Sequence, residues 1–138
     1  MSYKYLEHST DAFIEVKAKN LEEAFSVAGK SVVETIIDLK NIQEVEKKSI
    51  KVKGRNLENL LYNWLEEIVT ITITDGFAIS NFFVNIKKNT EYEIISTVSG
   101  EKLDLEKHNF KVEIKSPTFH LMKIKENDEV TLRYLLDL

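Results

Sequence analysis

The sequence predicts an α+β fold, with two helices packed on one face of a mixed, largely antiparallel β-sheet arrangement that resembles an α/β/β sandwich. Two amphipathic helical patterns occur in the first half of the 138-residue chain. The second half is a series of alternating, strand-like segments separated by short polar turns. Helices in one half and a strand meander in the other are typical of α+β domains, and this length is enough for a substantial core.

The first half begins with two strand-like segments and a helix. Met1–Tyr5 is interpreted as a short lead-in strand, and the alternation of apolar and charged residues over Ala12–Ala18 predicts a second strand. Asn20 is a favourable helix N-cap, and Glu23 completes a pattern like a capping box. Apolar residues then recur at three-to-four spacing to about Asp38, which predicts one buried helix face. This stripe consists of Leu21, Ala24, Phe25, Ala28, Val32 and Ile36.

A second helix follows a strand predicted over Ser49–Lys53, and Asn56 caps it. Its apolar residues give the strongest periodic signal in the chain. They are Leu57, Leu60, Leu61, Trp64, Leu65 and Ile68. The β-branched tail Val69–Thr74 favours a strand by propensity, and the residues alone leave helix and strand open. The pair Asp75-Gly76 predicts a turn after this tail.

The remainder of the chain predicts strands. The candidates are Phe77–Ile86, Glu91–Ser99, Phe110–Lys115, Thr118–Lys125 and Glu129–Asp137. Lys87–Thr90 and Glu126–Asp128 are polar enough for hairpin turns. The stretch Gly100–His120 contains two of the three histidines and the only proline, and it is interpreted as an ordered hairpin with polar groups at its ends.

Composition limits the classes of function. The chain has no cysteine, which excludes thiolate sites, and its N-terminus has no signal-peptide pattern. No apolar run approaches the roughly 18 residues of a membrane span. We therefore expect a cytoplasmic protein without a membrane partner. A net charge of −4 argues against a protein that coats nucleic acid by bulk charge.

Two aspartates are candidate metal ligands, although their spacing cannot bring them together. Asp11 precedes a strand, and Asp137 follows an apolar run next to Leu138, whose carboxylate adds an oxygen donor if the chain ends there. Carboxylates and other oxygen atoms are the ligands that calcium and magnesium take. A turn carboxylate at Asp11 and a solvated carboxylate at Asp137 are the structural alternatives.

The other polar groups favour structural interpretations. His8, His108 and His120 lack the spacing of a zinc helix, which favours structural or interface histidines over a zinc site. Glu66-Glu67 is interpreted as a solvated helix face, because neighbouring helical residues point about 100° apart. The basic cluster Lys47–Arg55 fits a solvated edge strand, with phosphate contact as the alternative. Without a visible catalytic pair, the chain fits an accessory protein better than an enzyme.

Short motifs along almost the whole chain resemble the archease family. They are His8-Ser9-Thr10-Asp11, Leu21-Glu22-Glu23-Ala24-Phe25, the helix Leu57–Glu67, Gly100–Asp104 with Lys107-His108, Ile114–His120, and Asp137-Leu138. The chain departs from the family pattern in three places. Ser9-Thr10 replaces the usual Thr-Ala, Phe119 replaces a common tyrosine, and the tail Val69–Thr74 is β-branched where family members carry leucine and aromatic residues in a helix.

The resemblance implies that residues 1–138 form a single archease-like domain and that the second helix extends into Val69–Thr74. It implies a calcium-type divalent metal site with Asp11, Asp137 and Leu138 as ligands. It also implies an accessory protein, not an enzyme, that activates the RtcB-type tRNA-splicing ligase. That ligase joins a phosphate-bearing RNA end to a 5′-hydroxyl with GTP and manganese.

In this interpretation the protein promotes ligase guanylylation and multiple turnover, and tRNA reaches it through the ligase. The alternative is a chaperone-like or tRNA-binding modulator of tRNA cytosine methyltransferase specificity. The oligomeric state stays open.

Overall fold

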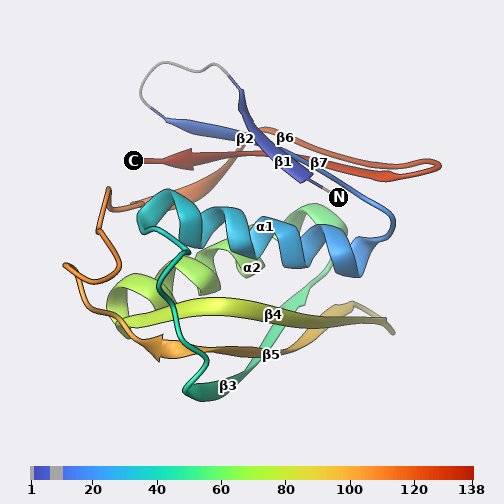
Figure 1. Cartoon of the computed structure of the whole chain (residues 1–138). Helices are drawn as coiled ribbons and strands as arrows, with labels where there is room; N and C mark the ends of the chain where they lie inside the picture. The colour runs from blue at the N-terminus through green and yellow to red at the C-terminus, as the bar shows by residue number, and fades with distance from the viewer. Residues whose placement is uncertain (1, 7–10) are drawn as a thin grey trace.

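The strands form two antiparallel sheets, and the two helices lie between them (Figure 1). The computed structural model describes residues 2–6 and 11–138. The first sheet has the strand order β1-β2-β7-β6, and the second has the order β3-β5-β4. The strands of the first sheet are β1 (Ser2–Leu6), β2 (Ala12–Ala18), β7 (Val130–Asp137) and β6 (Ser116–Glu126). Those of the second are β3 (Glu46–Gly54), β5 (Tyr92–Lys102) and β4 (Phe77–Lys88).

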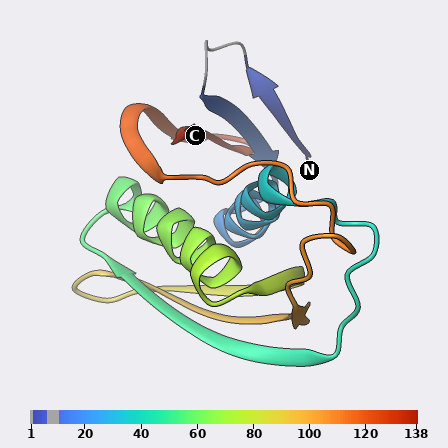
Figure 2. The ribbon, with the colours of Figure 1, turned by 90° about the vertical axis from the view of Figure 1, so that its left-hand side faces the viewer.

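The predicted α+β class is confirmed, and the layering is more specific than the prediction. Both helices pack on sheet faces as expected, but the strands divide into two sheets, so the helices are covered from both sides (Figure 2). The prediction allowed a mixed sheet, whereas every strand pair that joins the described elements is antiparallel. The core therefore lies in the helical layer and on the two sheet faces that enclose it.

Helix α1 (Leu21–Ile36) begins as the sequence predicts. The side-chain oxygen of Asn20 accepts a hydrogen bond from the Glu23 backbone N–H at 2.8 Å, which satisfies one free donor of the first turn. The apolar stripe is buried apart from the half-buried Leu21, and Phe25 is fully enclosed. The helix ends at Ile36, two residues before the predicted end, because Ile37 already has an extended backbone.

Helix α2 (Leu57–Val69) has the same kind of N-cap, with Asn56 accepting from the Asn59 N–H at 2.8 Å. Trp64 is fully buried, and its indole N–H donates to the Phe25 carbonyl oxygen at 2.8 Å, which joins the two helices. The tail continues as a π-helix, η1 (Thr70–Thr74), so the open choice is settled as helical. Burial of Ile71 in the core outweighs the local strand propensity.

The predicted strand Phe110–Lys115 is wrong, and the stretch Gly100–His120 is not a hairpin. Gly100 lies in β5 and Ser116 in β6, and these two strands belong to different sheets. The segment 103–115 between them is irregular. The backbone of this segment forms hydrogen bonds with residues at and just after the end of α1, and not with a neighbouring strand. The Lys111 N–H donates to the Ile36 carbonyl at 2.7 Å, and the Asp38 N–H donates to the His108 carbonyl at 2.8 Å.

The hairpins β4–β5 and β6–β7 are present where the polar turns predict them. Strand β6 lies at a sheet edge, where the missing N–H of Pro117 is tolerated. The β6–β7 register shifts between Thr118 and Lys123, and Leu121 within this bulge has a left-handed φ of 62°. In the described residues, neither helix has the length and apolar character needed to cross a membrane.

Candidate metal site

The register of two central strands aligns the two predicted metal ligands. Strand β2 pairs antiparallel with β7, and the pairing ends with Ala12 opposite Leu136. The next position along β2 is Asp11, and the next along β7 is Asp137. Residues that face each other across antiparallel strands have Cα atoms about 4.5 to 5.5 Å apart. Two acids that are 126 positions apart in the chain thus occupy adjacent positions at one end of the first sheet.

Asp137 continues the alternation of β7 on the outer face of this sheet, and Asp11 is a bend residue that immediately precedes β2. Ala12 and Leu136 are buried in the core, so the positions beside them point the other way. Asp137 is exposed and Asp11 is half-buried. The backbone of Asp137 is fixed on its other side, because the Lys115 N–H donates to its carbonyl oxygen at 2.8 Å. The backbone of Asp137 is therefore held by its pairing with Ser116 of β6 and by this bond from Lys115.

The donor set at this end suits a hard cation. Two carboxylates carry the negative charge, and Leu138, which packs partly against the core, brings its backbone oxygen next to Asp137. Calcium takes six to eight oxygen ligands, including carbonyl groups and water. The part of the chain that the structure describes contains no group of three or more acidic or histidine side chains suited to a metal. A cation here would complete its shell with backbone oxygens and water.

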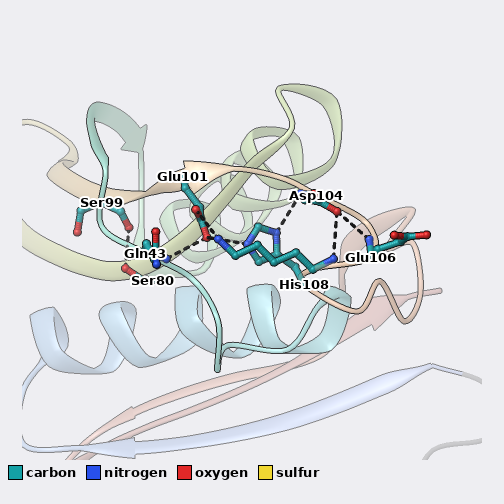
Figure 3. Close-up of polar contacts among 8 residues, drawn as sticks. Gln43, Ser80, Ser99, Glu101, Asp104, Glu106 and His108 are labelled. Carbon is teal, nitrogen blue, oxygen red and sulfur yellow. Dashed lines mark hydrogen bonds and ion pairs between the residues drawn. The ribbon is translucent and has the colours of Figure 1, made fainter.

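His108 is part of a different polar cluster, in which the polar groups form hydrogen bonds with one another (Figure 3). Its ring is fully buried. The Asp104 backbone N–H donates to Nδ1 at 3.0 Å, so the ring hydrogen stands on Nε2, which donates to the Glu101 carboxylate at 2.8 Å. Glu101 also accepts from the Gln43 N–H at 3.0 Å and from the Lys107 ammonium at 2.9 Å. We call these five residues the Glu101–His108 network.

The charges of this network are stabilised by the donors around them. The Lys107 ammonium, the Gln43 N–H and the His108 ring hold the pKa of Glu101 at about 2. The backbone N–H groups of Lys107 and Glu106 lower the pKa of Asp104, and each donates to Oδ1 at 3.0 Å. Each acceptor is matched by a donor, so the network ties the segment after β5 together.

The prediction that the histidines are structural is confirmed for His108. His120 is exposed in the β6 bulge, where its N–H donates to the Thr118 hydroxyl at 2.9 Å. His8 and Ser9 lie outside the described residues.

The remaining candidates mostly take the structural roles that the sequence favours. The Lys47–Arg55 cluster lies on and just after β3, which is an edge strand as predicted. Glu66 is exposed on α2. Glu67 is half-buried, and this burial, with the nearby carboxylates of Asp75 and Glu66, raises its pKa.

One polar group was missed by the sequence reasoning. The Glu44 carboxylate accepts hydrogen bonds from the Asn81 amide and from the Ser99 hydroxyl, which is 2.8 Å away. These two bonds lower the pKa of Glu44. Phe83, on the same strand as Asn81, is 61% exposed. The alternation within Phe77–Ile86 already assigns Asn81 and Phe83 to one face, but only the sheet shows that this face is outward.

Comparison with known proteins gives concordant matches. A sequence model of the Archease protein family (MTH1598/TM1083) matches residues 3–138. Protein archease of Pyrococcus abyssi is 36% identical over 125 residues, which cover 90% of this chain and 88% of the relative. Protein archease of Pyrobaculum islandicum is 35% identical over 140 residues, covering 99% and 95%. The solution structure of Methanobacterium thermoautotrophicum protein 1598 matches with a TM-score of 0.80 and 27% identity, covering 99% and 98%.

These matches extend over nearly the full length of both partners in each comparison. They include the sequence at both ends of the chain, where the two aspartates lie, and the solved structure has the same fold. The chain therefore belongs to the archease family.

Proposed function

We propose that this protein is an accessory factor of tRNA splicing that activates an RtcB-type RNA ligase, promoting its guanylylation and multiple turnover. Membership of the archease family supports the accessory role in tRNA splicing. The proposal adds two points to this role: the partner is the ligase, and the protein acts on it through a bound divalent cation. The observation that supports them is the β2–β7 register, which ends with Ala12 opposite Leu136, the residues next to Asp11 and Asp137.

In this proposal, Asp11, Asp137 and an oxygen of Leu138 hold a calcium-type divalent ion. When bound, the ion would supply the positive charge that lets two carboxylates remain close together. The strands position both residues: Asp11 immediately precedes β2, and Asp137 is the last residue of β7, which lies between β2 and β6. The result is a defined acidic end of the first sheet, which is the surface we assign to the ligase.

The test is multiple-turnover RNA ligation by the cognate ligase, with substoichiometric amounts of this protein. We expect many joined products per ligase with the wild-type chain. Asp11→Asn and Asp137→Asn should return turnover to the level of the ligase alone, because each removes a charged ligand without changing volume. Asp128→Asn is the matched control, since Asp128 is an exposed aspartate in the hairpin at the other end of β7.

The outcomes separate the parts of the proposal. Full stimulation by both aspartate variants would contradict the role of the acidic pair while leaving ligase activation intact. A wild-type chain that does not change turnover of a competent ligase would contradict ligase activation itself. That result would favour the alternative, a modulator of tRNA cytosine methyltransferase specificity.

A further inference from the structure

The second sheet turns an exposed face away from the helices, on the side opposite the first sheet (Figure 1). The register of β3, β5 and β4 gives the rows of this face. Lys51, Ile95 and Asn85 form one row, and Thr97 and Phe83 lie side by side in the next. Phe83 is 61% exposed and Ile95 is 39% exposed. We call this surface the outer β3–β5–β4 face.

The outer β3–β5–β4 face is basic on an acidic chain. Lys47, Lys51 and Lys53 point outward from β3, and Lys87 points outward from β4. From the Lys47 row to the Lys53 row, Glu93 is the acid on these described strands, and the Glu44 carboxylate, from the segment before β3, also reaches this face at Asn81 and Ser99. The Glu93 carboxylate lies 3.8 Å from the Lys51 ammonium and 4.0 Å from that of Lys53. The net charge of the whole chain is −4, so the positive charge here is a local concentration.

An open hollow of about 490 Å³ lies beside Phe83 on this face. Asn81, Thr97 and Ser99 contribute amide and hydroxyl groups to its lining, and Lys47 lies at its rim. The Glu44 carboxylate, which borders it, already accepts from Asn81 and Ser99. The exposed ring of Phe83, these polar groups and the Lys47 side chain thus line the same hollow.

We propose that the outer β3–β5–β4 face binds single-stranded RNA, with one base stacked on Phe83 and the lysines of β3 along the phosphates. Open sheet faces with exposed aromatics recognise unpaired bases, which stack on the rings, while a basic groove follows the backbone. A duplex hides its base faces, so the exposed ring favours a single strand. Outward hydroxyl and amide groups at Thr97 and Asn85 can bond the ribose 2′-hydroxyl, which favours RNA over DNA.

This RNA site is independent of the proposed ligase activation. It lies on the second sheet, whereas Asp11 and Asp137 lie on the first, and the helical layer separates the two. The outer face of the first sheet also carries lysines, among them Lys17. There, however, Glu15 is paired with Arg133 at 2.7 Å and Lys4 at 3.5 Å. The hollow beside Arg133 is lined by Phe13, Leu121, Met122 and Lys123, none of which carries a hydroxyl group.

The test is fluorescence anisotropy of a labelled ten-nucleotide RNA of mixed sequence, titrated with the full chain at low salt. Phe83→Leu should weaken binding roughly tenfold, because it removes the ring and keeps an apolar side chain. Phe83→Tyr should retain binding within about twofold, since a phenol ring stacks as well. Lys51→Glu should weaken binding and reduce the salt dependence by about one phosphate contact. Lys17→Glu is the charge-matched control and should leave binding within about twofold.

Each alternative has its own signature. Equal binding by Phe83→Leu and the wild type, or equal losses in Lys51→Glu and Lys17→Glu, would overturn the site. Preference for the DNA strand or for duplex RNA of the same sequence would overturn the ligand class. If the wild type binds no RNA but forms a dimer that Phe83→Leu abolishes in sedimentation, the face belongs to self-association. Because Phe83 is largely exposed, these variants should remain folded.

Discussion

The Glu101–His108 network and the Asp11–Asp137 pair are both carboxylate sites near the ends of strands, but they differ in how their charges are satisfied. Glu101 accepts hydrogen bonds from three donor groups of this chain, and the pKa of its carboxyl falls to about 2. The aspartate pair consists of acids brought together by register, with Asp137 exposed. A carboxylate that its own chain surrounds with donors stabilises structure, whereas two acids at one end of a sheet, one exposed and one half-buried, form an oxygen donor set that suits an external cation.

This difference predicts opposite consequences for mutation. Changes in the network should alter folding and leave any cation effect intact. Changes in the pair should alter the cation effect and leave the folding of the cation-free chain almost unchanged. The experiments below follow this contrast from the largest expected effect to the smallest.

Substitution His108→Ala should cause the largest loss of stability, roughly 2 to 4 kcal/mol in the free energy of unfolding. The ring is fully buried, and its removal leaves the Asp104 N–H without its acceptor. Urea unfolding at pH 7 measures the effect. His120→Ala is the control, because His120 is exposed, and it should change stability by less than about 0.5 kcal/mol. Equal effects at the two histidines would show that the network does not hold the loop.

Substitution Asp137→Asn should abolish calcium-induced stabilisation. A ligand at 100 times its dissociation constant stabilises the folded state by about 2.7 kcal/mol. Unfolding curves with and without calcium should show this gain for the wild type and for His108→Ala, but not for Asp137→Asn. Without calcium, Asp137→Asn should differ from the wild type by less than about 0.5 kcal/mol. Retention of the full calcium effect would contradict the assignment of Asp137 as a ligand.

The features that are local in sequence could be predicted. The caps at Asn20 and Asn56 need only residues three positions away, and both occur as expected. The stripes of both helices and the polar hairpin turns are equally local. They place most of the regular elements and the α+β class without knowledge of the tertiary structure.

The features that depend on distant contacts could not be predicted. Asp11 and Asp137 meet because β2 pairs with β7, and no spacing rule contains that register. The segment 110–115 alternates like a strand, but the backbone N–H of Lys111 bonds to the last residue of α1, Ile36, and not to a neighbouring strand. The tail Thr70–Thr74 is helical because the core accepts Ile71. In each case a tertiary contact outweighs local propensity.

The network should also make stability depend on pH in acid. The pKa of Glu101 is about 2 in the folded chain, below its ordinary value of 4.5. A carboxyl with a lowered folded pKa contributes fully above the unfolded pKa and loses that contribution as the pH falls through the folded pKa. Stability should therefore decline between about pH 4.5 and pH 2, and Glu101→Gln should flatten that decline. Glu46→Gln, at an exposed position on β3, is the control in acid unfolding curves. An unchanged slope in Glu101→Gln would contradict the role of this carboxylate.

Thr72 is the third kind of polar site in this comparison, and it predicts the smallest effect, with the opposite sign. Its hydroxyl is buried in the π-helix and has no hydrogen-bond partner within the described part of the chain. Thr72→Val keeps the shape and the β-branching but removes the unsatisfied group, so stability should rise by about 0.5 to 1 kcal/mol. Thr70→Val, at an exposed position of the same turn, should change little. A loss of stability in Thr72→Val would show that the hydroxyl is satisfied by water. The Thr72 hydroxyl would then resemble the groups of the Glu101–His108 network, because it would have a hydrogen-bond partner in the folded state.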